Sequence, residues 1–431
     1  MPSLTNYWYL LAAIPVFGLC VFIHELGHFL TAKWAGIRVE EFGLGLPPRF
    51  LGVRKRGNGR GWEVVWFGGP RSPEDAYEEE RRSALDDAAD GIGTAAMSVT
   101  GAVLGVRSHG TPNAELDRPE KHHTIYSLNF LPIGGFVRMP GENGEMRDDN
   151  GRYDPGSFAA KTAGKRIIVL VAGVTMNIIL AMVLFMIAYG VGQPVPAPQV
   201  GNIVKGSPAD VAGLRAEDTF ITVNGQSVQQ FSDVQDITTK VISQNQDKDT
   251  VPITIVARHK GQSTTFTTVV NVRVHPPRGQ GPMGIVSTAN TILIKYPFWE
   301  APVRGVGETF SVTGQFISTI GQMITGQTPA NVTGPVGIVK FTGEVAQSVP
   351  TVGWWPILSL TAILNINLAI VNILPFPALD GGRIFLILIE LLRGGKRLKP
   401  ELEGIINLAG MAILLTLMVI ITVSDVLHWN G

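Results

Sequence analysis

The 431-residue sequence has little charge and a single cysteine. Charged residues make up 16% of the chain and hydrophobic residues 45%, whereas a typical soluble domain is about 25% charged. This balance indicates an integral membrane protein. The 35 basic and 35 acidic residues cancel, and no basic run is interleaved with aromatic residues, so no nucleic acid partner is expected. One cysteine, Cys20, excludes an internal disulfide framework and a cysteine-based metal cluster.

Four segments are apolar enough to cross a bilayer, whose hydrocarbon core takes about 20 helical residues. No Lys or Arg precedes Tyr7, so the first segment is interpreted as a retained span rather than a signal peptide. The third contains Pro375 and Pro377 and is too long for one crossing, so it is expected to break partway. The sequence therefore predicts a polytopic α-helical membrane protein, with spans at about 7–30, 166–191, 356–392 and 405–424.

Basic residues beside the spans predict the orientation. They cluster at 33–49, 161–166 and 393–399, and all three clusters fall on one side if the spans alternate. Because Lys and Arg favour the cytoplasmic side, residues 31–165 and 393–404 are expected in the cytoplasm and 192–355 outside. The expected location is the inner (cytoplasmic) membrane of a cell.

Residues 196–276 alternate short strands with turn signals. Gly-Ser-Pro-Ala-Asp at 206–210, Ala-Gly-Leu at 212–214 and Val-Asn-Gly at 223–225 follow one another. This order resembles a PDZ domain, with Glu217 in place of the usual Gly. The resemblance implies that an extended peptide or a free C-terminus binds by strand addition. A β-rich spacer without a ligand is the alternative.

The remaining extramembrane stretches are less informative. Strands close to the membrane are expected in 31–165, interrupted by an insertion at about 72–118 that is charged and then rich in Ala and Gly. No role is assigned to the insertion, and a mobile loop is the favoured interpretation. In the 277–355 linker, residues 297–325 predict an amphipathic helix at the outer surface of the bilayer.

The strongest chemical signal is His24-Glu25-Leu26-Gly27-His28 in the first span. Two histidines four residues apart lie on one face of a helix and can hold one Zn²⁺, with Glu25 beside the open position as general base. These polar side chains are costly in lipid unless they face a metal or a wet cavity. A purely structural role is therefore disfavoured.

A catalytic zinc needs a third protein ligand and one open site. The other histidines (His109, His122, His123, His259, His275 and His428) lie in extramembrane or terminal stretches. Asp380 is the candidate, because it follows the expected break in the third span, where freed backbone groups must be satisfied by protein or water. A simple helix cap is the alternative role for Asp380.

Taken together, these motifs resemble the site-2 protease family, and specifically its bacterial RseP-like branch. The resemblance rests on the His-Glu-Leu-Gly-His motif, the Asn-x-x-Pro-x-Pro-x-Leu-Asp-Gly string at 372–381, the PDZ-like stretch between them and Gly-Pro-Val-Gly-Ile at 334–338. It implies zinc held by His24, His28 and Asp380, with Glu25 as catalytic base, in regulated intramembrane proteolysis.

The resemblance also implies how a substrate is handled. Asn372 would bind the substrate backbone or the developing oxyanion. Residues 130–142, including Gly135 and Phe136, would form a membrane-associated β-hairpin that receives the unwound substrate. The implied substrates are single-span membrane proteins already trimmed, such as anti-sigma factors or signal-peptide remnants.

Two departures from the family pattern stand out: the insertion at 72–118, and room for one PDZ-like domain where some relatives have two. Two rival functions remain. A zinc-binding membrane scaffold predicts that Glu25 is dispensable, and a metal transporter predicts weak, exchangeable zinc. Neither rival explains why a Glu stands beside the first histidine.

Overall fold

The computed structural model describes residues 11–55, 61–66, 124–142, 153–329 and 333–427. The insertion expected at 72–118 lies outside these residues. The chain divides into two compact units. Phe185–Gly305 and Ser348–Leu358 form the second unit, and the rest of the described chain forms the first.

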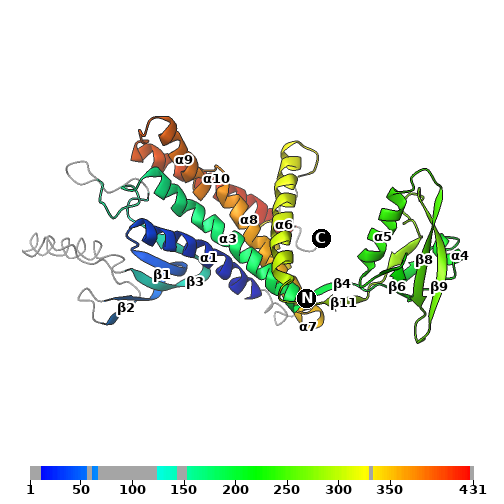
Figure 1. Cartoon of the computed structure of the whole chain (residues 1–431). Helices are drawn as coiled ribbons and strands as arrows, with labels where there is room; N and C mark the ends of the chain where they lie inside the picture. Colours follow the sequence, from blue (N-terminus) through cyan, green and yellow to red (C-terminus); the bar gives the residue numbers. More distant parts are fainter. Residues whose placement is uncertain (1–10, 56–60, 67–123, 143–152, 330–332, 428–431) are drawn as a thin grey trace, which may run out of the picture. The chain divides into compact units, whose positions relative to one another are not determined.

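Among the described residues, four helices are long and apolar enough to cross a membrane, which matches the expected number of spans (Figure 1). An α-helix suits this setting because it satisfies its own backbone hydrogen bonds in lipid. The third of them is followed by a break at 374–379 and then by α9 (Asp380–Leu392). The four helices are α1 (Ala13–Ala35), α3 (Ala163–Val191), α8 (Trp355–Ile373) and α10 (Pro400–Leu427).

Helices α1 and α3 pack closely where the His-Glu-Leu-Gly-His motif lies. A Cβ atom at Gly27 would stand 2.5 Å from the carbonyl oxygen of Ala172, so only glycine permits this approach. Small residues at such crossings are typical of membrane helices. On α8, Asn365 donates a hydrogen bond of 3.1 Å to Sγ of Cys20 on α1, which joins the two helices.

A sheet of the order β2-β1-β3 contacts α1. The first residues of β1 lie between two parts of β3: Glu41 pairs with both Ile125 and Arg138, and Leu44 pairs with both Leu128 and Gly135. Residues 135–138 therefore form an outer edge of the sheet. The three strands are β1 (Glu41–Lys55), β2 (Trp62–Trp66) and β3 (Ile125–Arg138).

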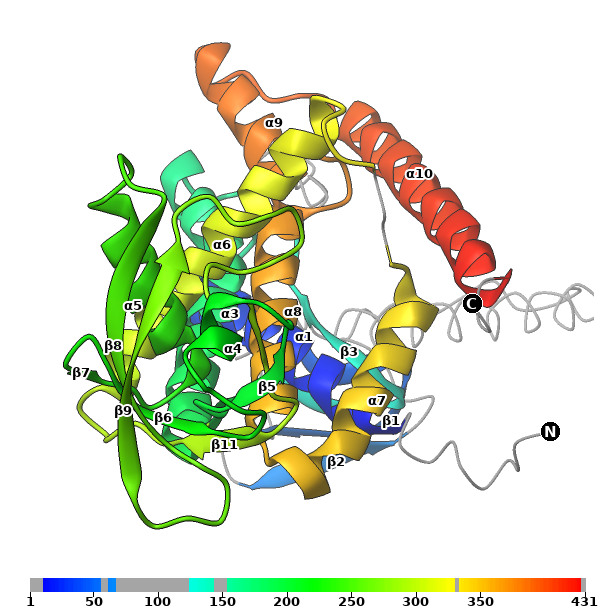
Figure 2. The same ribbon diagram turned by 90° about the vertical axis from the view of Figure 1, so that its right-hand side faces the viewer.

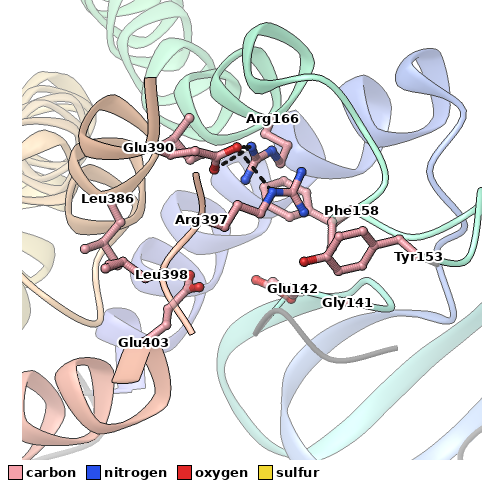
Figure 3. A pocket seen from close by; sticks show the side chains of 12 residues that line it. Gly141, Glu142, Tyr153, Phe158, Arg166, Leu386, Glu390, Arg397, Leu398 and Glu403 are labelled. Carbon is pink, nitrogen blue, oxygen red and sulfur yellow. Dashed lines mark hydrogen bonds and ion pairs between the residues drawn. The ribbon is translucent and has the colours of Figure 1, made fainter. Parts of the chain in front are cut away.

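Ion pairs attach α9 to its neighbours (Figure 3). Arg166, at the start of α3, donates to both carboxylate oxygens of Glu390 at 2.7 Å. Arg397, which follows α9, donates to the same carboxylate at 3.2 Å. Arg383 pairs with Glu142 of the segment after β3. Because α9 begins at Asp380, these pairs hold the helix that carries a candidate ligand.

Asp425 of α10 anchors helix α7 (Pro335–Val352). The backbone N–H groups of Gly334 and Gly337 donate to its two carboxylate oxygens at 3.1 and 2.8 Å. A Cβ at Gly334 would lie 2.6 Å from Oδ2 of Asp425, so glycine is needed there. The Gly-Pro-Val-Gly motif thus serves a helix contact.

The linker region holds α6 (Ala301–Ile324) as well as α7, whereas only one helix was expected there. Four apolar side chains along α6 recur every seven residues and are each more than half exposed: Val303, Phe310, Ile317 and Ile324. This pattern fits an amphipathic helix. Its position on the outer membrane surface stays a prediction.

The second unit contains a β-rich fold with two short helices. Figure 2 shows α5 beside the strands β8 and β9, and Val234 of α5 packs with Ile253 and Ile255 of β8 in one core. The sheets have the orders β7-β6-β8-β9, β10-β5 and β11-β4. The elements are β4 (Gln193–Pro196), β5 (Val200–Ile203), α4 (Pro208–Val211), β6 (Thr219–Val223), β7 (Gln226–Ser227), α5 (Phe231–Ser243), β8 (Thr250–Arg258), β9 (Thr265–Arg273), β10 (Ile285–Ser287) and β11 (Thr291–Ile294).

The expected end of this domain at residue 276 was too early. Met283 is 3% exposed and belongs to the same hydrophobic core. Strand β10 pairs with β5 through Ile285 and Ile203. The sequence did not reveal this because a three-residue strand carries no periodic signal.

Candidate metal centre and active site

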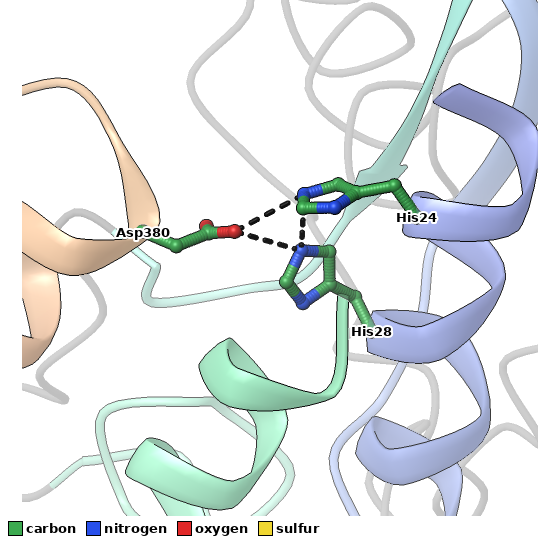
Figure 4. A group of neighbouring side chains, drawn as sticks. All are labelled: His24, His28 and Asp380. Atoms are coloured by element: carbon green, nitrogen blue, oxygen red, sulfur yellow. Dashed lines mark hydrogen bonds and ion pairs between the residues drawn. The ribbon is translucent and has the colours of Figure 1, made fainter. Parts of the chain in front are cut away.

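His24, His28 and Asp380 converge at one point (Figure 4). The Nε2 atoms of the two histidines are 3.1 Å apart, and they lie 3.1 and 3.2 Å from Oδ2 of Asp380. Each histidine is 6% exposed. The packing of α9 near α1 thus brings together His24 and Asp380, which are 356 residues apart in the sequence.

The break before α9 directs Asp380 toward the histidines. Ala378 has φ 74°, a left-handed conformation that is costly for a residue with a side chain. A Cβ at Gly381 would lie 2.2 Å from the carbonyl oxygen of Leu374, and one at Gly382 would lie 2.2 Å from that of Phe376. The two glycines after Asp380 therefore let the broken segment fold back onto α9. The N-cap position is Leu379, so Asp380 is a metal-ligand candidate and not the cap.

Helix α3 packs against the two imidazole rings. Nδ1 of His28 donates to the carbonyl oxygen of Val169 at 2.8 Å. A Cβ at Gly173 would lie 2.5 Å from Nε2 of His28. The amide of Asn177 lies 3.3 Å from Nδ1 of His24. The sequence motifs did not point to Val169, Gly173 or Asn177 as neighbours of the site. The available signal was a Gly and an Asn four residues apart in an apolar span.

Glu25 lies against strand β3. The backbone of Val137 and the side chains of His28 and Asp380 lie near its carboxylate. A Cβ at Gly135 would be 3.5 Å from Cγ of Glu25, so Gly135 lies beside the site. The ring of Phe136 covers Gly43 on the sheet. A substrate-binding role for these two residues stays a prediction.

Asn372 also reaches the centre. Its Nδ2 lies 3.3 Å from Nε2 of His24. It comes from the last turn of α8, immediately before the break. The structure therefore places an amide donor next to the three candidate ligands.

Comparison with known proteins identifies the family. The sequence profile of Peptidase family M50 matches residues 12–109 and 105–417. The chain belongs to this family, the site-2 proteases. It is 28% identical over 430 residues to a putative zinc metalloprotease of Clostridium acetobutylicum (98% of each chain). It is 29% identical over 432 residues to zinc metalloprotease RasP of Geobacillus kaustophilus (97% of each), and 27% identical over 440 residues to probable protease eep of Enterococcus faecalis (96% of this chain, 97% of the relative).

As a site-2 protease, the chain is a multi-pass membrane zinc metalloendopeptidase, and its donor set fits that metal. Two imidazole nitrogens and a carboxylate oxygen suit zinc, and three protein ligands leave one position open. Bonds of about 2.0–2.1 Å in a tetrahedral site place ligand atoms roughly 3.3 Å apart. The observed separations of 3.1 to 3.2 Å match this geometry.

Proposed function

We propose that this site-2 protease cuts peptide bonds within the membrane-spanning segments of other membrane proteins. The supporting observation is the convergence of His24, His28 and Asp380, with Glu25 beside them, on helices α1 and α9. Helix α1 is a candidate span. A protease centre at that depth acts on chains that share the bilayer.

In this proposal, His24, His28 and Asp380 hold zinc and Glu25 moves the proton. Zinc in such a site supplies Lewis acidity that activates water and polarises a peptide carbonyl. The carboxylate of Glu25 accepts a proton from the attacking water and passes it to the leaving nitrogen. The amide of Asn372 donates to the developing oxyanion, a role that fits its position 3.3 Å from Nε2 of His24.

The substrate is proposed to bind as an added strand on β3. A membrane helix hides its peptide bonds in its own hydrogen bonds, so cleavage requires local unwinding. Residues 135–138 pair with β1 on one side, and the Val137 backbone faces Glu25. An unwound segment added along this edge would satisfy its amides and lie beside the base. Gly135 leaves room for it.

The β-rich domain of the second unit is proposed to be PDZ-like and to bind an extended peptide or a free C-terminus. A cavity of about 350 Å³ lies between α5 and the loop before β10, lined by residues that include Phe231, Val234, Thr238, Met283 and Ile285. Among the described strands, β10 pairs only with β5. Its other edge is therefore open for strand addition.

The proposed location is the inner membrane, with the active site toward the cytoplasm and the β-rich domain outside. Arg166 and Arg397 bind the same carboxylate, Glu390. The basic ends of α3 and α9 therefore lie together, as the positive-inside rule requires of cytoplasmic ends. The proposed substrates are single-span membrane proteins already trimmed on the outer side, such as anti-sigma factors or signal-peptide remnants, in regulated intramembrane proteolysis.

The test compares the purified chain with its Glu25→Gln variant on a single-span membrane protein truncated on its outer side. Zinc content is measured for both. Wild type should cut within the span, whereas the variant should keep its zinc and lose at least about a hundredfold in rate, because general-base catalysis contributes about 10²–10⁴-fold. Equal cleavage by both would remove Glu25 from the mechanism. Zinc retained by both without cleavage would support a scaffold, and zinc flux across liposomes would support a transporter.

A further inference from the structure

Three residues of α3 face the two histidines at intervals of four: Val169, Gly173 and Asn177. Residues four apart on a helix lie on one face. The first presents a carbonyl oxygen, the second presents no side chain and the third presents an amide. Of these, Asn177 contacts the ring nitrogen of His24 that does not face the other ligands.

The two ring nitrogens of His28 have different partners. Nδ1 donates its hydrogen to the carbonyl of Val169 at 2.8 Å. Its Nε2 therefore carries the lone pair, and this is the atom 3.2 Å from Oδ2 of Asp380. An acceptor at one ring nitrogen thus fixes the tautomer that leaves the other free to bind a metal.

His24 needs an equivalent acceptor. Its Nε2 faces Nε2 of His28 and Oδ2 of Asp380, so a metal bound there leaves the hydrogen on Nδ1. The group nearest to Nδ1 is the amide of Asn177, whose nitrogen Nδ2 faces it at 3.3 Å. Asn177 is 0% exposed, and its Oδ1 has no hydrogen-bond partner among the described residues.

We propose that Asn177 is a positioning residue for the zinc centre, with its amide turned over so that Oδ1, in the place of Nδ2, accepts the Nδ1–H of His24. The two ends of an amide occupy the same space, and hydrogen bonding decides which end faces the ring. With Oδ1 turned to Nδ1, the unpaired oxygen gains a donor and Nε2 keeps its lone pair for the metal. With Nδ2 turned to Nδ1, the hydrogen would move to Nε2 and block coordination.

This inference rests on the proposed role of His24 as a zinc ligand. Helix α3 then holds both ligands in the coordinating tautomer, through a backbone carbonyl for His28 and a side-chain amide for His24. Outer partners of this kind typically change metal affinity by about 10–100-fold when they are removed.

The experiment measures zinc affinity of the purified full chain by competition with a chromophoric chelator, and the absorption bands of the Co²⁺-substituted protein. Asn177→Leu removes the acceptor at similar volume and should weaken zinc binding by about 10–100-fold. Asn177→Asp keeps acceptor oxygens and should restore the affinity and the Co²⁺ bands. The matched control is Asn365→Leu, which removes another 0% exposed amide that bonds to Cys20 and Thr361 instead of a histidine. It should bind zinc like wild type.

Equal zinc affinity in Asn177→Leu and Asn365→Leu would overturn the proposal. An Asn177→Asp variant that binds zinc as weakly as a variant with no acceptor would also overturn it, because that result requires the amide to act as a donor. The Asp variant decides the matter even if the Leu variant fails to fold. His24→Ala separates the two levels of inference: if it binds zinc like wild type, the ligand assignment itself is wrong.

Discussion

At the residue scale, glycine determines how closely α3 approaches the metal centre. A Cβ at Gly173 would lie 2.5 Å from Nε2 of His28 and 2.7 Å from Cε1 of His24, distances at which something must shift. The atoms that would move are the ones that converge on the metal position. The centre is therefore sensitive to one methyl group on a helix that supplies no ligand of its own.

We therefore expect Gly173→Ala to lose zinc. The methyl group should displace the imidazole of His28 and lower the zinc content after dialysis to well below one per chain, with cleavage lost in parallel. Gly190→Ala is the matched control in the same helix, because a Cβ there meets nothing within 4 Å. Full zinc occupancy in Gly173→Ala would show that the two helices separate without cost.

At the element scale, charged pairs position α9, which begins with Asp380. The side chains of Arg166 and Glu390 are 8% and 12% exposed. Removing one member of a buried ion pair leaves the other charge unpaired, which costs about 3–5 kcal/mol. An exposed pair contributes roughly 0–1 kcal/mol, because solvent screens it.

We therefore expect Glu390→Gln to lower the free energy of unfolding by about 3 kcal/mol, measured by chemical unfolding in mixed micelles. The control is Glu300→Gln, which breaks a pair with Arg304 at 2.7 Å whose side chains are 41% and 44% exposed. That change should stay under about 1 kcal/mol. Similar losses in the two variants would mean that burial does not strengthen the Arg166–Glu390 pair.

At the scale of the whole molecule, the β-rich domain is inserted between β4 and β11, which pair with each other. Pro196 is opposite Thr291 in this ladder. The two ends of the segment 197–290 therefore lie next to each other. A short turn can replace them without separating the strands.

Deleting residues 197–290 and closing the gap with a two-residue turn should leave the zinc content unchanged, because no candidate ligand lies in the deleted stretch. If the domain filters substrates by size, the deletion variant should cut an untrimmed single-span protein as fast as a trimmed one, whereas wild type should prefer the trimmed form several-fold. Retained discrimination would rule out the filter. A Val234→Asp variant, which places a charge in the α5 cavity, would then show whether peptide binding matters.

Several features of this protein were predictable from sequence because their cost in lipid is high. A long apolar run must be a helix, since only a helix satisfies its backbone in the bilayer. Histidines and carboxylates in such runs need a metal or water, so His24, Glu25, His28 and Asp380 stood out individually. Asn372 was marked by its place in the same motif as Asp380.

Tertiary structure alone decided how these residues are held. That Asp380 meets His24 depends on the fold-back at Ala378 and the packing of α9. The acceptor for His28 is a backbone carbonyl, Val169, which any residue would supply, so the sequence could not mark it. Asn177 was visible as a polar residue in a span, but only packing shows that it faces a ring nitrogen. Local periodicity determines which segments form helices, whereas contacts between distant segments determine which atoms those helices bring together.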